Sequence, residues 1–155
     1  DISKALGNET YKNINFLPFL NKNSEVNELL NSINIDLTGL SGAEGWNLPA
    51  FNATCLGKWS VVLNSTSHKD WANQSNSILV EPSGKIDAYD DVFFKKNSPF
   101  NQGKINDFSK DSFIDAMETA VEKCSSENIN GIKLKDKFTY ESSINQILKI
   151  IKHEP

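Results

Sequence analysis

The stretch LSGAEGWNLPAFN, residues 40–52, decides the fold that we expect for this chain. An apolar run ends at Leu40, Glu44 follows in a glycine-flanked loop, and a helix is predicted to begin near Asn47 and to stop at Gly57. A strand, a glycine-containing loop and a helix start present free backbone N–H groups and the positive end of a helix dipole to an anion. In open α/β sheets, ligands bind beyond the carboxyl ends of the strands, where this loop is expected.

Length and composition limit the classes of protein to which the chain can belong. Its 155 residues, 38% apolar and 23% charged, fit one ordinary globular domain. The net charge of −4 argues against a nucleic-acid surface, because phosphate binding needs clustered Lys and Arg. No apolar stretch approaches the roughly 20 residues that span a bilayer, and no signal peptide is visible. We therefore expect a single domain over residues 1–155, with no nucleic-acid partner and no transmembrane segment.

The cysteines and the first residue bear on where the chain works. Cys55 and Cys124 fall on the apolar faces of expected helices, so we interpret them as small buried hydrophobic residues in a reducing compartment. This interpretation favours a cytoplasmic location. The chain begins with Asp1 rather than Met, from which we expect a processed or excised piece of a longer protein.

Short apolar runs alternate with helical patterns along the chain. Strands are predicted at 14–17, 35–40, 59–63 and 77–80. Helices are predicted after a cap at Ser24, over 48–56, after a cap at Ser109 and over 140–151, with one helical turn at 70–72. Helices between short strands imply right-handed βαβ units. The expected fold is therefore α/β, a Rossmann-like three-layer sandwich with a short, mainly parallel sheet, helices on both faces and apolar helix stripes facing the core.

Residues 84–108 interrupt this alternation. They place aromatic side chains among polar ones, at Tyr89, Phe93, Phe94, Phe100 and Phe108. A stretch this long without helix periodicity is an irregular excursion with a role or a small structure of its own. Two interpretations stay open: the aromatic side chains pin the excursion onto the body, or it forms a flap that faces a substrate or another subunit. A hairpin through residues 92–95 is one structure for it.

Most kinds of chemical site lack their residues in this sequence. His68 and His153 are the only histidines and have no Cys or carboxylate partners at ligand spacing, so we expect no metal and no cofactor. No serine stands in a Gly-x-Ser-x-Gly elbow, and no nucleotide phosphate loop is present. What remains is Glu44, which can accept hydrogen bonds from hydroxyls, beside the first-turn amides of Asn47 and Leu48, which suit a phosphate. Together they describe a site for a sugar nucleotide; the alternative is a solvated turn residue beside a plain helix start.

Further polar residues are expected near this site. Asn52 is placed one helical turn beyond Leu48, on the polar side of the helix and opposite Cys55. The next strand is followed by a polar run that would rim the same sheet edge, Ser65, Thr66, Ser67 and His68. For Asn52 and His68, an ordinary surface residue is the alternative.

Residues 40–57 resemble the donor-site signature of the group 1 glycosyltransferases, which are retaining enzymes with two Rossmann-like lobes, the GT-B architecture. That signature is a Pro-Ser or similar pair, then Glu-Gly-aromatic-Gly-Leu-Pro, a second Glu, and Ala and Gly before an apolar strand. Here it reads Ser41-Gly42, then Glu44-Gly45-Trp46-Asn47-Leu48-Pro49. The likeness covers residues 13–82 and 109–152.

The resemblance implies a role for each residue of the motif. Glu44 would be the carboxylate of the catalytic site that holds the hydroxyls of the donor sugar, and the backbone at Asn47 and Leu48 would hold the diphosphate. Asn52 stands where the family has the Glu that holds the ribose, and Asn47 where it has a glycine. The remaining residues that we count as donor-binding are Ser41, Gly42, Gly45, Ser65, Thr66 and His68.

The resemblance also implies what this chain lacks. In the family an N-terminal lobe binds the acceptor, and an Arg and a Lys from the first part of the C-terminal lobe neutralise the diphosphate. We therefore predict a donor-binding lobe with little or no transfer activity of its own. Two alternatives stay open: a non-catalytic assembly module built on the 84–108 excursion, and an unrelated Rossmann-like enzyme with Glu44 as general acid or base. Oligomerisation also stays open.

Overall fold

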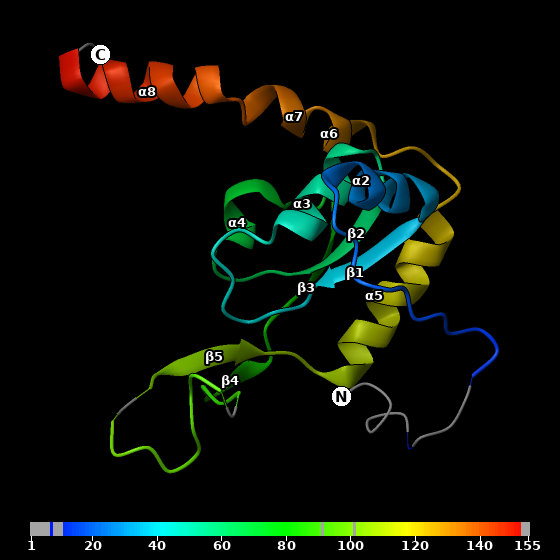
Figure 1. The fold of residues 1–155 in the computed structure, drawn as a ribbon, viewed down its shortest axis with the longest axis vertical. Coiled ribbons are helices and arrows are strands. Elements are labelled where there is room, and N and C mark those ends of the chain that lie inside the picture. Colours follow the sequence, from blue (N-terminus) through cyan, green and yellow to red (C-terminus); the bar gives the residue numbers. More distant parts are fainter. Residues whose placement is uncertain (1–6, 8–10, 91, 101, 153–155) are drawn as a thin grey trace.

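The fold is α/β, as the sequence predicts. The structure is a computed structural model that describes residues 7, 11–90, 92–100 and 102–152. Its main sheet holds three parallel strands in the order β1-β2-β3, namely β1 (Ile35–Gly39), β2 (Trp59–Leu63) and β3 (Ile78–Val80) (Figure 1). The predicted strands at 35–40, 59–63 and 77–80 are confirmed to within a residue or two at their ends.

Strand β2 is the centre of the sheet, and its residues are buried on both faces. Val61 and Leu63 pack toward α5 (Lys110–Lys123), whereas Val62 packs toward α3 (Leu48–Cys55) and α4 (His68–Trp71). A β-branched, apolar strand favours this position, because alternate side chains point to opposite faces. Helices therefore cover both faces of the sheet, which confirms the three-layer sandwich (Figure 1).

Helix α5 lies close to the sheet because its buried residues are small. Ala116 and Ala120 pack against β2 and β3, with Phe113 at the edge of the contact. Ser109 caps the helix as predicted, since its hydroxyl oxygen accepts the N–H of Ser112 at 3.0 Å. The predicted stripe of this helix is buried only in part, because Val121 is mostly exposed.

Asn128 ties the far end of the sheet to the short helices α6 (Ile129–Ile132) and α7 (Leu134–Lys137). Its fully buried side chain donates to the carbonyls of Lys58 at 2.9 Å and Asn76 at 2.7 Å, and accepts the N–H of Gly131 at 2.8 Å. Because each of its polar atoms has a partner, burial of this amide leaves no hydrogen bond unmade. The hydrogen bonds of Asn128 therefore hold the segment that leads from α5 to α6 against the ends of the sheet strands.

Two expectations for the first part of the chain were wrong. Residues 14–17 form no strand; the N–H of Ile14 instead bonds to the carbonyl of Tyr11 at 3.2 Å, in a turn. A short apolar run becomes a strand only where a neighbouring strand supplies ladder partners. Helix α2 (Asn23–Ser32) begins before Ser24, because the carboxylate of Glu25 accepts the backbone N–H groups of Asn21 and Lys22 at 3.0 and 3.2 Å.

Residues 84–108 form an antiparallel hairpin, but not at the predicted place. The strands are β4 (Gly84–Asp87) and β5 (Lys104–Asp107), and the segment 92–95 lies in the loop between them. The amides of Val92, Phe93 and Phe94 all donate to Oδ1 of Asp90, at 2.8–2.9 Å. Those bonds bend the chain and leave no amide free for a strand ladder.

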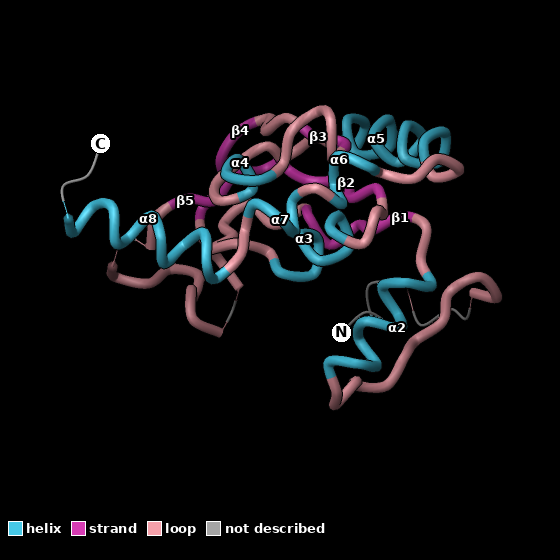
Figure 2. The backbone as a smooth tube through the Cα atoms, turned by 90° about the horizontal axis from the view of Figure 1, so that it is seen from above, coloured by secondary structure: helices cyan, strands magenta, loops and turns pink. Residues whose placement is uncertain are grey.

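The apolar stripe of the last helix, α8 (Tyr140–Lys152), does not face the core. The helix exists as predicted, but the described structure buries none of its residues, and Tyr140 is 92% exposed. Both views show α8 extending away from the body (Figures 1 and 2). The stripe lacks a neighbour because α7 ends at the rim of the α3 layer and the chain leaves the sheet there.

The cysteines are also less buried than predicted. Cys55 and Cys124 are free thiols, each only partly buried. Burial nevertheless raises the pKa of Cys55 to about 11, with Lys135 acting in the opposite direction. None of the helices in the described residues is both long and apolar enough to cross a bilayer.

Candidate functional site

The loops after β1 and β2 meet at the carboxyl edge of the sheet. The hydroxyl of Ser67 donates to the backbone carbonyl of Glu44 at 2.9 Å, and the indole N–H of Trp71 donates to the carbonyl of Trp46 at 3.1 Å. These bonds join two segments more than twenty positions apart in the chain. The predicted site loop is therefore held by the loop of the neighbouring strand; Trp71 was not among the predicted site residues.

Glu44 offers a carboxylate that the fold does not use. The residue is partly buried, and no described residue forms a hydrogen bond or an ion pair with its side-chain oxygens. Beside it, a Cβ added at Gly45 would meet nothing within 4 Å. The carboxylate can therefore accept hydrogen bonds from the hydroxyl groups of a ligand. It does not line the larger grooves beside β3, between α2 and α3, or in the hairpin loop.

Asn47 sets the start of α3 by both its backbone and its side chain. Its backbone is left-handed, with φ 61° and ψ 70°, a conformation that Gly adopts freely and Asn tolerates. Its side-chain oxygen accepts the N–H of Ala50 at 3.2 Å, and its side-chain NH₂ donates to the carbonyl of Thr38 on β1 at 2.8 Å. Asn47 thus fastens the helix start to the strand.

The start of α3 presents fewer free amides than a full helix N-terminus. Pro49 has no N–H, and the N–H of Ala50 is bonded to Asn47. This leaves the amide of Leu48 among the first three helical residues, and the Leu48 side chain is 61% exposed. A phosphate at this position would be held by a small number of backbone donors.

Gly42 is required for packing rather than for access of a ligand. Both the backbone N–H and the side-chain NH₂ of Asn106 on β5 donate to its carbonyl, at 3.2 and 3.3 Å. The backbone of Asn106 occupies the place where a Cβ of residue 42 would lie. Ser41 before it is exposed. The hairpin therefore covers the first part of the predicted donor loop.

Only some of the residues that follow β2 are accessible at the carboxyl edge of the sheet. Ser65 is buried and Thr66 is exposed with a left-handed backbone, φ 47°. His68 is fully buried, with Nδ1 2.8 Å from the carbonyl of Leu63 and its ring edge-on to Trp71. The Oγ of Ser65 and the Nε2 of His68 have no hydrogen-bond partner among the described residues. His68 therefore supports the loop from below, and Thr66 and Ser67 are more accessible.

Asn52 was predicted to lie on the side of the helix opposite Cys55, and this prediction was wrong. Both line one groove of about 590 Å³ between α2 and α3, because residues three apart share a helix face. Val26 and Leu30 of α2 and Lys135 of α7 also line the groove. Asn52 is exposed and lies on this groove, one helical turn from the start of α3.

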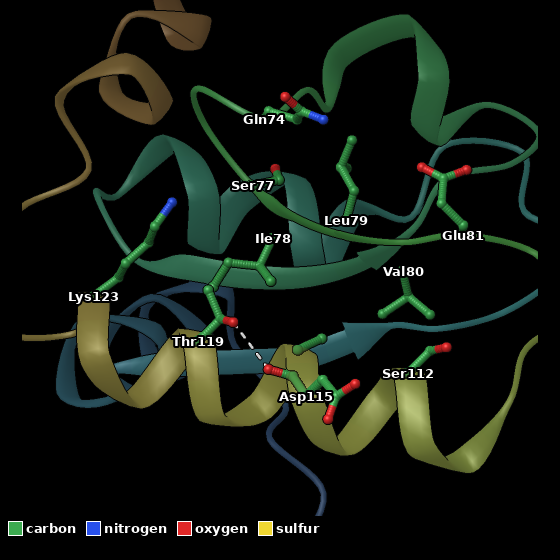
Figure 3. A pocket seen from close by; sticks show the side chains of 11 residues that line it. Gln74, Ser77, Ile78, Leu79, Val80, Glu81, Ser112, Asp115, Thr119 and Lys123 are labelled. Carbon is green, nitrogen blue, oxygen red and sulfur yellow. Dashed lines mark hydrogen bonds between the residues drawn. The ribbon is translucent and has the colours of Figure 1, made fainter.

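A separate groove of about 580 Å³ runs between β3 and α5 (Figure 3). Figure 3 shows Asp115, Thr119 and Lys123 on α5 across from the strand that carries Ile78 and Val80, whereas Leu79 points away from the helix. The hydroxyl of Thr119 donates to the backbone carbonyl of Asp115 at 2.9 Å. No predicted site residue lines this groove.

Comparison with models of protein families and with curated proteins found no match for this chain. Within the described residues, no three or more His, Cys, Asp or Glu side chains come together to hold a metal ion. The fold and the site thus define an α/β domain with a carboxylate and a helix start at the carboxyl edge of its sheet. Its function is argued below from these residues.

Proposed function

We propose that this chain is the donor-binding lobe of a retaining GT-B glycosyltransferase. In this proposal it binds a nucleotide-diphosphate sugar and transfers little or no sugar without a second lobe. The observation that carries the proposal is the geometry of residues 44–48. The free carboxylate of Glu44 precedes helix α3, and Asn47, with a left-handed backbone, caps the start of that helix. Asn47 stands where the group 1 glycosyltransferases have a glycine. A need for positive φ at that position accounts for both residue types.

Each part of a sugar nucleotide has a place in this arrangement. The hydroxyls of the sugar would bond to the carboxylate of Glu44, and the diphosphate would lie near the amide of Leu48 at the positive end of α3. The groove that holds Asn52 and Lys135 would receive the nucleoside. Because the helix start offers few free amides, the diphosphate would need further cations from elsewhere to bind tightly.

Calorimetric titration with uridine, guanosine and adenosine diphosphate sugars tests the proposal. We expect one of them to bind, and Glu44→Gln to weaken binding about ten- to hundredfold, since a hydrogen bond to a charged group contributes about 1.5–3 kcal/mol. Glu118→Gln, at an exposed position on α5, is the matched control and should leave affinity unchanged. Asn52→Glu, which restores the residue of the family pattern, should tighten binding. Flat titrations of the folded wild-type chain would refute donor binding.

A non-catalytic assembly module is the second candidate. The observation that favours it is the apolar face of α8, which the described structure leaves uncovered. In this case the titrations stay flat for wild type and Glu44→Gln alike, and substitutions on α8 change assembly with another polypeptide. The two candidates therefore differ in whether Glu44 or α8 carries the measured effect.

A further inference from the structure

The hairpin loop presents apolar side chains outward. Val92, Phe93 and Phe100, which we call the phenylalanine tip, are 66%, 84% and 79% exposed. The loop extends beyond β4 and β5, away from the three-stranded sheet (Figure 1). Large apolar side chains gathered on one exposed segment mark a surface that meets a partner.

Hydrogen bonds hold this loop in shape. Oδ1 of Asp90 accepts three consecutive amides, and these bonds lower the pKa of the Asp90 carboxyl. The side chain of Gln102 bonds to both backbone groups of Lys95, accepting its N–H at 2.9 Å and donating to its carbonyl at 2.8 Å. The tip is therefore presented by a structured loop, which lowers the entropy lost when it docks.

Two lysines lie in the segment that carries the tip. Residues 92–100 include Lys95 and Lys96 and no Asp or Glu, although two aspartates directly precede them. The carboxylate of Asp90 is turned to the amides of its own turn, and that of Asp87 pairs with Lys104 at 3.1 Å. Among the described residues, neither Lys95 nor Lys96 forms an ion pair. Their ammonium groups are therefore available to an anionic partner.

A cavity of about 560 Å³ lies beside the tip. Its lining includes Lys96, the hydroxyl-bearing residues Tyr89 and Ser98, and Pro99 with Phe100. It also includes Asp87, whose carboxylate is paired with Lys104. A cation, hydroxyl groups and an apolar wall suit a ligand with a phosphate next to hydrocarbon. A phospholipid headgroup and the start of its acyl chains have that chemistry.

We propose that the hairpin loop docks this protein onto an anionic phospholipid surface. The phenylalanine tip enters the boundary between headgroups and acyl chains, and Lys95 and Lys96 lie at the level of the phosphates. Exposed phenylalanine rings suit a bilayer, because lipids can move aside around them. The proposal is independent of donor binding at Glu44.

Sedimentation of the whole chain with lipid vesicles tests the proposal. We expect it to bind vesicles of phosphatidylcholine mixed equally with phosphatidylglycerol, and to bind pure phosphatidylcholine much more weakly. Phe93→Ser with Phe100→Ser should reduce partitioning at least tenfold. Lys95→Glu with Lys96→Glu should reduce it about twentyfold or more and reverse its dependence on salt, because the attraction to anionic lipid becomes a repulsion.

Matched variants show whether the effect belongs to the tip. Phe19→Ser, at a site 86% exposed outside the hairpin, and Lys133→Glu, also outside the hairpin, should bind as wild type does. Ile147→Ser with Ile150→Ser tests α8, which is also apolar on one face and also exposed. Binding that survives both tip variants, or that α8 alone abolishes, would overturn the proposal.

A spectroscopic test does not depend on reduced binding. In Phe93→Trp, vesicles with brominated acyl chains should quench the new tryptophan. The wild-type tryptophans should be quenched little, because Trp59 and Trp71 are buried and Trp46 packs against Phe51 and Phe138, outside the hairpin. The proposal is wrong if the introduced tryptophan is not quenched by bound vesicles, if wild type binds neither kind of vesicle, or if the tip instead drives self-association in solution.

Discussion

Helices α5 and α8 carry similar apolar stripes, but the stripe of α5 is packed against the sheet and that of α8 is exposed to solvent. The stripe of α5 contains small residues and lies against the sheet, where Ala116 and Ala120 are buried. The stripe of α8 contains larger residues, with Ile147 among them, and lies in the open. The size and spacing of apolar residues therefore show which face of a helix is apolar, whereas the path of the chain decides whether that face meets a neighbour.

The largest expected effect comes from placing the same charge in each stripe. Ala120→Asp puts an unpaired carboxylate against β2 and should lower the free energy of unfolding by about 3–5 kcal/mol. Ile147→Asp places it on the exposed face of α8 and should change the free energy by no more than about 0.5 kcal/mol. Urea denaturation followed by fluorescence measures both. Equal losses for the two variants would show that α8 packs onto the body in solution.

The second pair extends the comparison to the glycines of the site loop. Gly42→Ala should cost about 1–3 kcal/mol, because its Cβ needs the space of the Asn106 backbone and the hairpin must move. Gly45→Ala, three positions on, meets nothing within 4 Å and should cost less than about 0.5 kcal/mol. Thermal unfolding of the two variants gives the difference. A Gly42→Ala variant as stable as wild type would mean that the hairpin does not rest on the loop.

The third pair compares the caps of the two helices. Ser109 and Thr139 each accept one first-turn N–H through the side-chain oxygen, from Ser112 and Ser142, at 3.0 Å in both cases. Ser109→Ala should lower the free energy of unfolding by about 1 kcal/mol, because α5 unfolds only with the core. Thr139→Ala should reduce the helical circular dichroism of α8 and leave the global midpoint in place. A shift of the midpoint by Thr139→Ala would contradict the independence of α8.

The difference between local sequence pattern and contact with distant neighbours also explains what could be predicted from the sequence. The strands 59–63 and 77–80 and the cap at Ser109 depend on local pattern, and the structure confirms them. The missing strand at 14–17 and the exposed face of α8 depend on neighbours that no local pattern reports. At the site, the loop and helix start were predictable. The contact of Asn106 with Gly42 joins segments far apart in the chain, and the burial of His68 depends on side-chain packing, so neither could be predicted from local pattern.

The last comparison concerns Cys55, on the groove between α2 and α3, and its effect appears only at high pH. Burial raises its pKa from 9.0 to about 11 in the folded chain, so the folded state keeps the thiol proton when the unfolded state has released it. The stability that this thiol contributes is therefore full below pH 9 and falls as the pH rises from 9 to 11. Unfolding midpoints of wild type and Cys55→Ala should converge over that interval. If the unfolding midpoints of both proteins change equally with pH, the groove between α2 and α3 is open to water. The place proposed for the nucleoside would then be open to water as well.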